Sequence, residues 1–318
     1  MEDNKGELIL ARLIKKLKSN ELDLIRQGTL GPLNKPIAKV SPGEELIIET
    51  CDCYGDVVSQ ECPLDAIHQK RLPIYENPVT GPLYVVGAEP GDTLVVEILD
   101  IELPSTGTIT IEPGCGALQP WLEQQPTITK FVKIRNGKIY YRTNHGKIIE
   151  LTAKPFIGTI GVAPAAEAFS TFTPEKHGGN MDCEDVCVGS KLFLPVSVEG
   201  ALFGLGDVHA LQGDGEICGY GVEIPAKVKL KLDLKKSKSI GWPRIETPDA
   251  IATVCSSKPL EDAARLAYLE LIKWLEEDYG FERYDAYMFL SIAARARIAQ
   301  IVDPLYTVEA ILPKKYLP

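Results

Sequence analysis

The sequence predicts a mainly β protein with a smaller α+β part at its C-terminal end. The 318 residues include 27 Gly and 23 Pro, more than in an average globular chain, which indicates many turns. Short β-branched and aromatic runs between turn residues recur as far as about residue 234. After residue 258 the apolar residues take a helical spacing instead. The length suits about two domains with a sizeable core.

The first part of the chain is predicted to form an extension followed by a β-sandwich domain. Residues 1–38 are the extension, in which 7–27 have a mixed period and are a candidate amphipathic helix. Residues 39–175 are the β-sandwich domain, where a turn followed by a strand occurs twice with similar sequence, at 41–50 and 89–98. Further strands are expected over 108–112, 127–134, 138–142 and 147–152, with a hairpin turn at Asn136-Gly137.

Residues 176–318 are predicted to form a second β unit and a C-terminal α+β subdomain. Strands are expected over 191–198 and over 226–234, where apolar and polar residues alternate. Pro259 and Gly280 delimit an amphipathic helix at about 259–279. A second helix is expected at about 283–299, and a closing strand at 307–312.

Charge and hydropathy exclude several classes of partner. The 34 Lys and Arg against 44 Asp and Glu give a net charge of −10, the wrong sign for phosphate contacts, so we expect no nucleic acid partner. No run approaches about 18 apolar residues, and the acidic start Met1-Glu-Asp is unlike a signal peptide. We therefore expect no membrane partner and a cytoplasmic location.

The cysteines favour packing over chemistry. The chain has 8 Cys, and its close pairs Cys51/Cys53 and Cys183/Cys187 lack a second pair at zinc-finger spacing. Cys115, in a glycine turn, is the candidate nucleophile, although no His lies near it in the sequence. The Gly-x-Ser-x-Gly motif of many serine hydrolases and the phosphate-binding Walker loop are absent from the sequence.

Histidine and acidic residues gather in two glycine-rich stretches. Asp207 and His209 are two apart, so an extended backbone would direct both side chains to one face. Asp214 and Glu216 follow between glycines, and His177 begins the other stretch. Imidazole with carboxylates suits zinc or another divalent metal, and a carboxylate outside the ligand set can act as a base. The alternative is that these residues only form tight turns, with Asp capping its own backbone.

Several longer motifs, in order along residues 40–317, resemble those of the acetamidase/formamidase family. They are Asn77-Pro-Val-Thr-Gly-Pro82, Gly87-Ala-Glu-Pro-Gly-Asp92, Ile157-Gly-Thr-Ile-Gly-Val-Ala-Pro164, His177-Gly-Gly-Asn-Met-Asp182, Val198-Glu-Gly-Ala-Leu202, Gly206-Asp-Val-His-Ala-Leu-Gln-Gly-Asp-Gly-Glu216 and Ile301-Val-Asp-Pro304. The first 38 residues show little of this resemblance.

The resemblance implies a fold, a reaction and cofactors. The fold is a jelly-roll-like β-sandwich joined to a barrel-like β unit and a C-terminal helix pair. The reaction is hydrolysis of the C–N bond of short linear amides, such as formamide or acetamide, to carboxylate and ammonia. Zinc is implied as the catalytic ion, and calcium as a candidate structural ion. The positions carried over are Asp52, His177, Asn180, Asp182, Asp207, His209, Asp214 and Glu216.

The leading hypothesis is a metal-dependent amidase that activates water. Its metal ligands are His177, Asp207, His209 and Asp52. Glu216, with Asp214 beside it, is the catalytic base that takes the proton of the water and returns it to the departing ammonia. The oxyanion is held by Asn180 or by the backbone N–H groups of Gly178 and Gly179. The residues assigned to the substrate or to the site loops are Asp182, Asn77 and Thr80.

Two alternative functions remain open, and one oligomeric state is predicted. The first rival is a non-catalytic β-sandwich binding module with structural calcium. The second is a cupin-like iron oxygenase, which needs a further His on a partner strand. We also expect a homodimer, because the helix pair carries more aromatic residues than a small subdomain usually hides. These residues are Trp274, Tyr279, Phe281, Tyr284, Tyr287 and Phe289.

Overall fold

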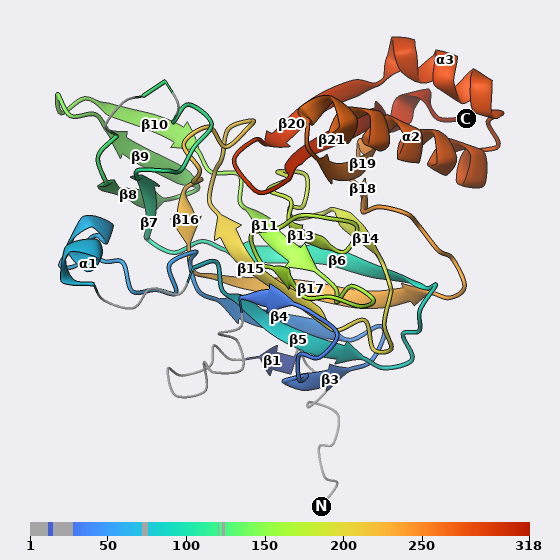
Figure 1. The fold of residues 1–318 in the computed structure, drawn as a ribbon, viewed down its shortest axis with the longest axis horizontal. Helices are drawn as coiled ribbons and strands as arrows, with labels where there is room; N and C mark the ends of the chain where they lie inside the picture. Colours follow the sequence, from blue (N-terminus) through green and yellow to red (C-terminus); the bar gives the residue numbers. More distant parts are fainter. Residues whose placement is uncertain (1–11, 15–27, 72–75, 120, 123–124) are drawn as a thin grey trace, which may run out of the picture.

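The structure is a computed structural model, and it describes residues 12–14, 28–71, 76–119, 121–122 and 125–318 (Figure 1). Two large sheets carry most of the strands, and a helix pair lies at one end of the molecule. The predicted mainly β fold with a C-terminal helix pair is confirmed. The described strands lie in open sheets and close no barrel, so the barrel-like β unit implied by the resemblance is not found.

The first sheet has nine strands, in the order β1 (Arg12–Ile14), β4 (Glu45–Thr50), β17 (Ala226–Lys235), β6 (Thr93–Glu102), β14 (Lys191–Pro195), β18 (Arg244–Glu246), β19 (Ala250–Ser257), β21 (Tyr306–Pro313) and β20 (Arg295–Gln300). Strand β17, from the second half of the chain, lies between β4 and β6 from the first half. Backbone hydrogen bonds therefore join the two halves of the sequence.

The second sheet has ten strands. Its main path is β10 (Ile148–Thr152), β9 (Lys138–Arg142), β8 (Ile128–Arg135), β7 (Thr106–Ile111), β16 (Glu223–Ile224), β15 (Phe203–His209), β11 (Phe156–Gly161) and β13 (Gly178–Asn180). Strand β5 (Val79–Val85) pairs with β15, and β3 (Ala38–Val40) pairs with β5. A separate two-stranded sheet joins β2 (Thr29–Leu30) to β12 (Phe169–Ser170).

The main core lies between the two large sheets. Ile48 of β4 and Val228 of β17 belong to the same buried cluster as Ile157 of β11 and Leu205 of β15. Alternate residues of β17 face this core, and the lysines between them face outward, which is the pattern of a sheet with one wet face. The packing of two sheet faces on one core is that of a β-sandwich.

Among the described residues, three α-helices complete the fold, and a short 3₁₀ helix (Lys314–Tyr316) follows the last strand. Helix α1 (Leu64–Lys70) lies near β8, and α2 (Leu260–Tyr279) and α3 (Arg283–Ala293) form the helix pair (Figure 1). The apolar face of α2, which includes Leu271 and Leu275, packs on β19 and β21 in a second core. None of the described helices is both long and apolar enough to cross a membrane.

Most predicted elements are confirmed, and one is wrong in part. The predicted second helix ends at Ala293 instead of 299, because Arg295–Gln300 forms edge strand β20 beside β21. Ala and Arg have high helix propensity, but the pairing with β21 overrides this weak preference. The candidate helix over 7–27 falls outside the described residues except for Arg12–Ile14, which form β1.

Candidate active site

Strand β15 brings Asp207 and His209 together in the middle of the ten-stranded sheet. Every residue of this strand is buried. Asp207 has a φ of 54°, so the backbone leaves the regular strand conformation there. Its Oδ1 lies 3.3 Å from Nε2 of His209, so the two side chains converge as their spacing predicts.

A further carboxylate faces His209 from the neighbouring strand. Glu223 of β16 is directly opposite His209 in the antiparallel register, which brings the two side chains into contact. Oε2 of Glu223 is 3.1 Å from Nε2 of His209, and both side chains are 1% exposed. The sequence analysis missed Glu223, because strand register cannot be read from a single carboxylate between apolar residues.

Gln212 fixes the orientation and the tautomer of His209. The side-chain amide of Gln212 donates to the carbonyl oxygens of Asp182 and Ala299, both at 3.2 Å. Its Oε1 therefore faces Nδ1 of His209, 2.8 Å away, and accepts the Nδ1 proton. In the neutral imidazole the lone pair of Nε2 then faces Asp207 and Glu223.

Two groups of candidate metal ligands adjoin at this point. Asp182, His209 and Glu216 place ligand atoms within 4.8 Å of one another, and so do Cys53, Asp207 and Glu223. A fifth carboxylate belongs to Asp303. Its Oδ2 accepts a hydrogen bond from the amide of Asn180 at 2.9 Å. We call the carboxyl groups with His209 the acidic cluster; its members are Asp182, Asp207, His209, Glu216, Glu223 and Asp303, all buried.

Burial and mutual repulsion dominate the electrostatics of the acidic cluster. Burial, reinforced by the charge of Asp207, raises the pKa of Asp182 to about 8. Burial also raises the pKa of Glu223 to about 7 and holds those of Glu216 and Asp303 well above their usual range. Burial lowers the pKa of His209, but Glu223 and Asp207 together raise it well above its usual value. The cluster therefore favours a positive charge at its centre.

The residues present fit a divalent cation. Asp182 is 0% exposed, and neither of its carboxylate oxygens has a hydrogen-bond partner among the described residues. A side chain at Gly158 would place its Cβ 2.5 Å from Oδ1 of Asp182 and 2.8 Å from Oδ2 of Asp207, so only glycine leaves this space free. Carboxylates with one imidazole suit zinc and other divalent ions.

A cavity of about 400 Å³ reaches the acidic cluster. Cys53 and Asp303 lie in its wall, together with Tyr54 and Tyr220, whose rings stack at 5.6 Å. Cys115 lies in the same wall, where burial, with help from Glu112, raises the pKa of its thiol to about 11. The thiol is therefore protonated near neutral pH, which favours the packing role over the nucleophile.

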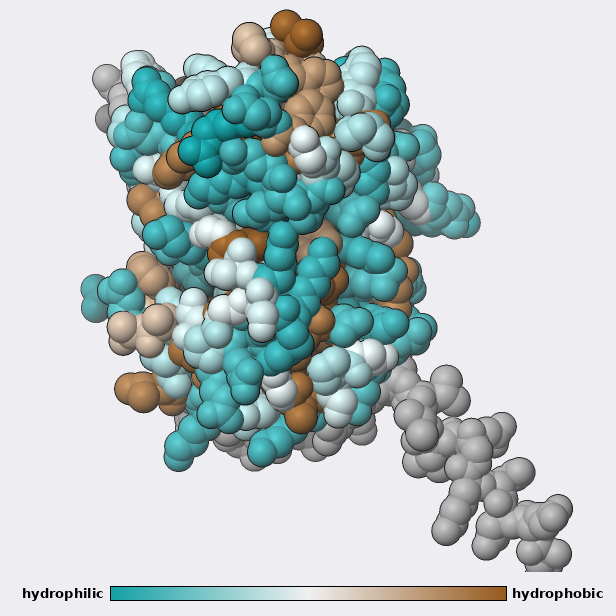
Figure 2. Space-filling view, turned by 90° about the vertical axis from the view of Figure 1, so that its right-hand side faces the viewer, coloured by the Kyte–Doolittle hydropathy of each residue, from teal (hydrophilic) through white to brown (hydrophobic). Residues whose placement is uncertain are grey.

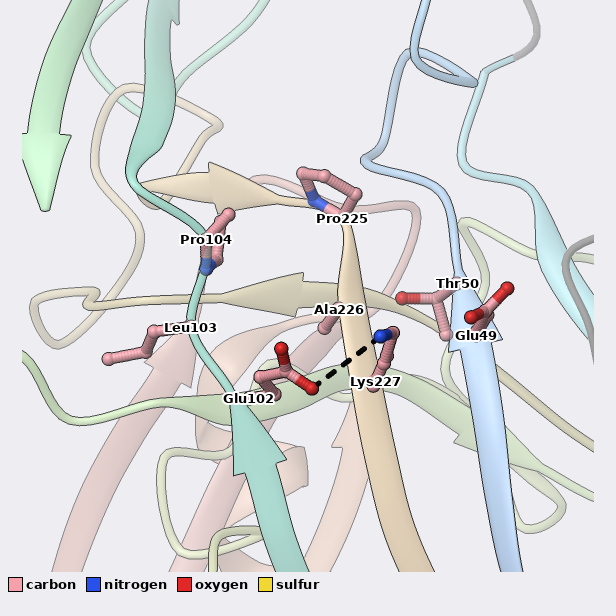
Figure 3. A pocket seen from close by; sticks show the side chains of 8 residues that line it. All are labelled: Glu49, Thr50, Glu102, Leu103, Pro104, Pro225, Ala226 and Lys227. Carbon is pink, nitrogen blue, oxygen red and sulfur yellow. Dashed lines mark ion pairs between the residues drawn. The ribbon is translucent and has the colours of Figure 1, made fainter. Parts of the chain in front are cut away.

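Another pocket, shown in Figure 3, lies at the ends of β4, β6 and β17. Its volume is about 210 Å³, and an ion pair of 3.7 Å joins Glu102 to Lys227 beside it. None of its lining residues belongs to the acidic cluster. We therefore take the cavity at Cys53 and Asp303 as the candidate active site.

Three residues predicted as metal ligands or base are not members of the two ligand groups. His177 is buried and stacks on Phe169, with ring centroids 5.1 Å apart, and burial lowers its pKa to about 4. Oδ1 of Asp52 accepts the backbone N–H groups of Tyr54 and Asp56, at 3.0 and 2.7 Å. Asp214 is 59% exposed and pairs with Arg297 at 2.5 Å.

The remaining predicted residues are engaged in hydrogen bonds or strand pairing. Asn180 accepts a hydrogen bond from Asn77 at 3.2 Å and another from Thr159. The N–H of Gly178 is engaged with the carbonyl of Glu175 at 3.0 Å. Gly179 also lies in β13, and Thr80 donates to the carbonyl of Glu49 at 2.7 Å.

Comparisons with known proteins place the chain in one family. The model of the Acetamidase/Formamidase family matches residues 32–173 and 165–316. The chain is 28% identical over 252 residues to a formamidase of Methylophilus methylotrophus, and 28% identical over 259 residues to an acetamidase of Mycolicibacterium smegmatis. Each match covers 63% of this chain, and the chain spans only 61% and 63% of those two curated relatives.

Solved structures match over more of the chain. The structure of an acetamidase from Bacillus halodurans has a TM-score of 0.83 at 38% identity and covers 91% of this chain and 95% of its own. That of an acetamidase from Yersinia enterocolitica has a TM-score of 0.86 at 35% identity and covers 98% of this chain and 94% of its own. With the family match over most of its length, the chain belongs to the acetamidase/formamidase family.

Proposed function

We propose that this chain hydrolyses the C–N bond of short linear amides to carboxylate and ammonia with a metal-activated water. The observation that carries the proposal is the buried acidic cluster, which surrounds one imidazole and reaches a small cavity at Cys53 and Asp303. The cavity size suits a small neutral molecule. Family membership supports the reaction class.

Asp182, His209 and Glu216 would hold the catalytic ion, for which we propose zinc; calcium is the candidate for a structural ion. When bound, a zinc ion lowers the pKa of its water toward about 7 and polarises the substrate carbonyl. Gln212 keeps the Nε2 lone pair of His209 available by accepting the Nδ1 proton.

We assign proton transfer to Asp303 and make Glu216 a ligand, although Glu216 was the base in the sequence analysis. Asp303 lies in the cavity wall, whereas Glu216 is not among the residues that line the cavity. Burial and the neighbouring Asp182 raise the pKa of Asp303, so its carboxyl holds a proton readily. It can deliver that proton to the departing nitrogen, because an amide anion is too poor a leaving group to depart unprotonated.

Asn180 positions Asp303 in this scheme. The amide NH₂ of Asn180 donates to Asp303, and its oxygen accepts from Asn77 and Thr159. Its oxygen and one of its two N–H donors are therefore engaged, which holds the carboxyl of Asp303 in place.

The test is ammonia release from formamide, acetamide, propionamide and urea, together with elemental analysis of the purified protein. We expect release from at least one of the linear amides, loss of release after chelation, and recovery on addition of Zn²⁺. A fully metallated protein that releases ammonia from none of these substrates contradicts the proposal. Oxygen consumption with substrate would favour the oxygenase instead.

We also propose that the chain forms a homodimer through the outer face of α3. Tyr284, Tyr287, Met288 and Ile292 recur at helical spacing and are 63 to 85% exposed. Figure 2 views the molecule from the side of the helix pair; this face is largely hydrophilic, and apolar groups gather at its top. Light scattering should give about twice the chain mass of 34.9 kDa, and Ile292→Glu should lower it to the monomer mass. A wild-type protein at the monomer mass at every concentration contradicts the dimer.

A further inference from the structure

The thiol of Cys53 lies beside two carboxylates that the first ligand group does not use. Cys53 is 9% exposed, and its sulfur lies with the carboxylate oxygens of Asp207 and Glu223 within 4.8 Å. Cys53 also lines the cavity of the candidate active site. The group lies next to the first one, because Nε2 of His209 is 3.3 Å from Asp207 and 3.1 Å from Glu223.

The backbone holds Cys53 in place. The residue lies in the turn after β4, where Oδ1 of Asp52 accepts the N–H groups of Tyr54 and Asp56. The carbonyl of Cys53 accepts the N–H of Asn77 at 2.7 Å. Asp52, which the sequence analysis assigned as a ligand, thus shapes the turn that presents the thiol.

Nε2 of His209 and Oε2 of Glu223 face one another between the two groups, 3.1 Å apart, and both side chains are 1% exposed. Gln212 accepts the Nδ1 proton of His209, so in the neutral imidazole Nε2 carries a lone pair. Two buried acceptors at this distance need a proton or a cation between or beside them.

The acidic cluster contains more carboxyl groups than the first ligand group uses. Five carboxyl groups surround one imidazole, namely Asp182, Asp207, Glu216, Glu223 and Asp303. The first ligand group uses Asp182 and Glu216, which leaves Asp207 and Glu223 beside Cys53 as a second set of donors.

We propose that Cys53, Asp207 and Glu223 hold a second divalent ion beside the catalytic one, and that the thiolate makes this a transition-metal site. Soft sulfur ligands select zinc-like ions, whereas calcium and magnesium bind oxygen ligands. Two metal ions side by side are a recurrent arrangement in hydrolases. Burial raises the pKa of the Cys53 thiol, but a coordinated ion deprotonates a thiol outright. The proposal deepens the proposed function, because both concern the same buried cluster.

The test titrates Co²⁺ into the chelator-treated protein and reads both stoichiometry and absorption. We expect two equivalents of cobalt per chain and a sulfur-to-cobalt charge-transfer band in the near ultraviolet. Cys53→Ser should remove the band and weaken binding of one equivalent at least tenfold. Cys53→Asp should restore the second equivalent without the band, because it returns an anionic ligand that lacks sulfur. Cys115→Ser is the matched control in the same cavity wall and should keep the band and both equivalents.

The outcomes separate this inference from the proposed function. A wild-type protein with one equivalent and no thiolate band overturns the second ion, and so does a band that persists in Cys53→Ser. The cobalt stoichiometry and the absorption band of the wild-type protein are measured without any substitution, so this result holds even if a variant does not fold. Ammonia release is measured on the same samples. Two equivalents with the band but no amide turnover contradict only the proposed function, whereas turnover with one equivalent and no band contradicts only this inference.

Discussion

The two buried histidines of the glycine-rich stretches have different surroundings, and they give a matched pair of variants. His209 touches Asp207 and Glu223, whereas the nitrogens of His177 have no hydrogen-bond partner among the described residues. We expect His209→Ala to lower metal affinity more than about 100-fold, because it removes the only imidazole of the cluster. His177→Ala should keep the metal, although loss of a buried ring costs about 2–4 kcal/mol of stability.

Elemental analysis after dialysis, with circular dichroism to check the fold, measures this difference. If folded His177→Ala comes out free of metal, His177 is a ligand, as the sequence analysis proposed. If His209→Ala keeps its full metal content, His209 has no place in the site.

Glu309 supplies a prediction of pH-dependent stability away from the cavity. The side chain is 0% exposed, and neither oxygen has a hydrogen-bond partner in the described part of the chain. Burial and the nearby Asp185 raise its pKa from 4.5 to about 8, although Arg297 opposes the rise. A carboxyl whose pKa is higher in the folded state does not destabilise the fold below pH 4.5, the ordinary pKa of Glu. As the pH rises toward 8, ionisation of this carboxyl progressively lowers the free energy of unfolding.

Glu309→Gln should therefore raise the free energy of unfolding at pH 8, by up to about 4 kcal/mol, and change it little at pH 5. Urea unfolding of both proteins at the two pH values measures the effect. The control is Glu150→Gln, since the Glu150 side chain is 54% exposed. An equal effect of Glu309→Gln at pH 5 and pH 8 would show that ionisation of this carboxyl does not limit stability.

Spacing along one strand was enough to predict part of the site. Asp207 and His209 lie two apart on β15, and Glu216 follows within the same stretch. Glu223 was missed because its contact depends on strand register, and Cys53 because the close pair Cys51/Cys53 has no second pair at zinc-finger spacing. Asp303 lay within a motif of the resemblance, but Asn180, which binds it, is 123 positions away.

At the scale of elements, a buried ion pair fastens helix α2 to the first sheet. Nη2 of Arg244 in β18 lies 2.7 Å from Oε1 of Glu270 in α2, and the side chains are 3% and 1% exposed. Glu270→Ala leaves the buried Arg244 with only the partly exposed Glu277 as a partner, at 2.9 Å, so it should cost about 3 kcal/mol of unfolding free energy. Denaturant unfolding measures this cost.

The control for Glu270→Ala is a surface pair on the same helix. Arg265 pairs with Asp262 at 2.6 Å, with side chains 73% and 47% exposed. Arg265→Ala should cost less than about 1 kcal/mol. A cost of Glu270→Ala as small as that of the control would mean that the apolar face of α2 alone holds the helix on the sheet.

Elements with strong local signals were the most predictable. Pro259 and Gly280 mark the ends of α2 to within one residue, and the Asn136-Gly137 turn joins β8 to β9 as expected. The boundary between α3 and β20 was missed because Ala and Arg favour a helix locally, whereas pairing with β21 overrides this preference. The pairing of Arg297 with Glu309 across β20 and β21 is a contact that the sequence of one segment does not contain.

At the scale of the whole molecule, the alternation of apolar and polar residues predicted where strands form, but not the order of the strands in the sheets. Strand β17 alternates clearly, yet nothing in its residues indicates that it lies between β4 and β6, which precede it by more than a hundred positions. The open sheets depart from the barrel-like unit for the same reason, since closure depends on which strands meet. Only the long motifs that resemble those of the acetamidase/formamidase family indicated the family, because together they include residues from distant segments of the chain.

The acidic cluster connects distant parts of the molecule, so metal should stabilise the whole fold. His209 lies in the ten-stranded sheet, whereas Asp303 lies in the loop between β20 and β21 of the nine-stranded sheet. Without a cation, burial disfavours the ionised carboxylates, and their mutual repulsion opposes the packing of these parts.

A chelator should therefore lower the unfolding temperature, and added Zn²⁺ should restore it. A ligand at 100 times its Kd stabilises the folded state by about 2.7 kcal/mol, which corresponds to roughly 4 °C for a chain of this size. Differential scanning calorimetry across a series of Zn²⁺ concentrations measures the shift, and the unfolding temperature should rise with the logarithm of free Zn²⁺. His209→Ala is the control and should show little dependence on Zn²⁺. Equal unfolding temperatures for wild-type protein with chelator and with Zn²⁺ would show that the cluster holds its charges without a metal, through bound protons alone.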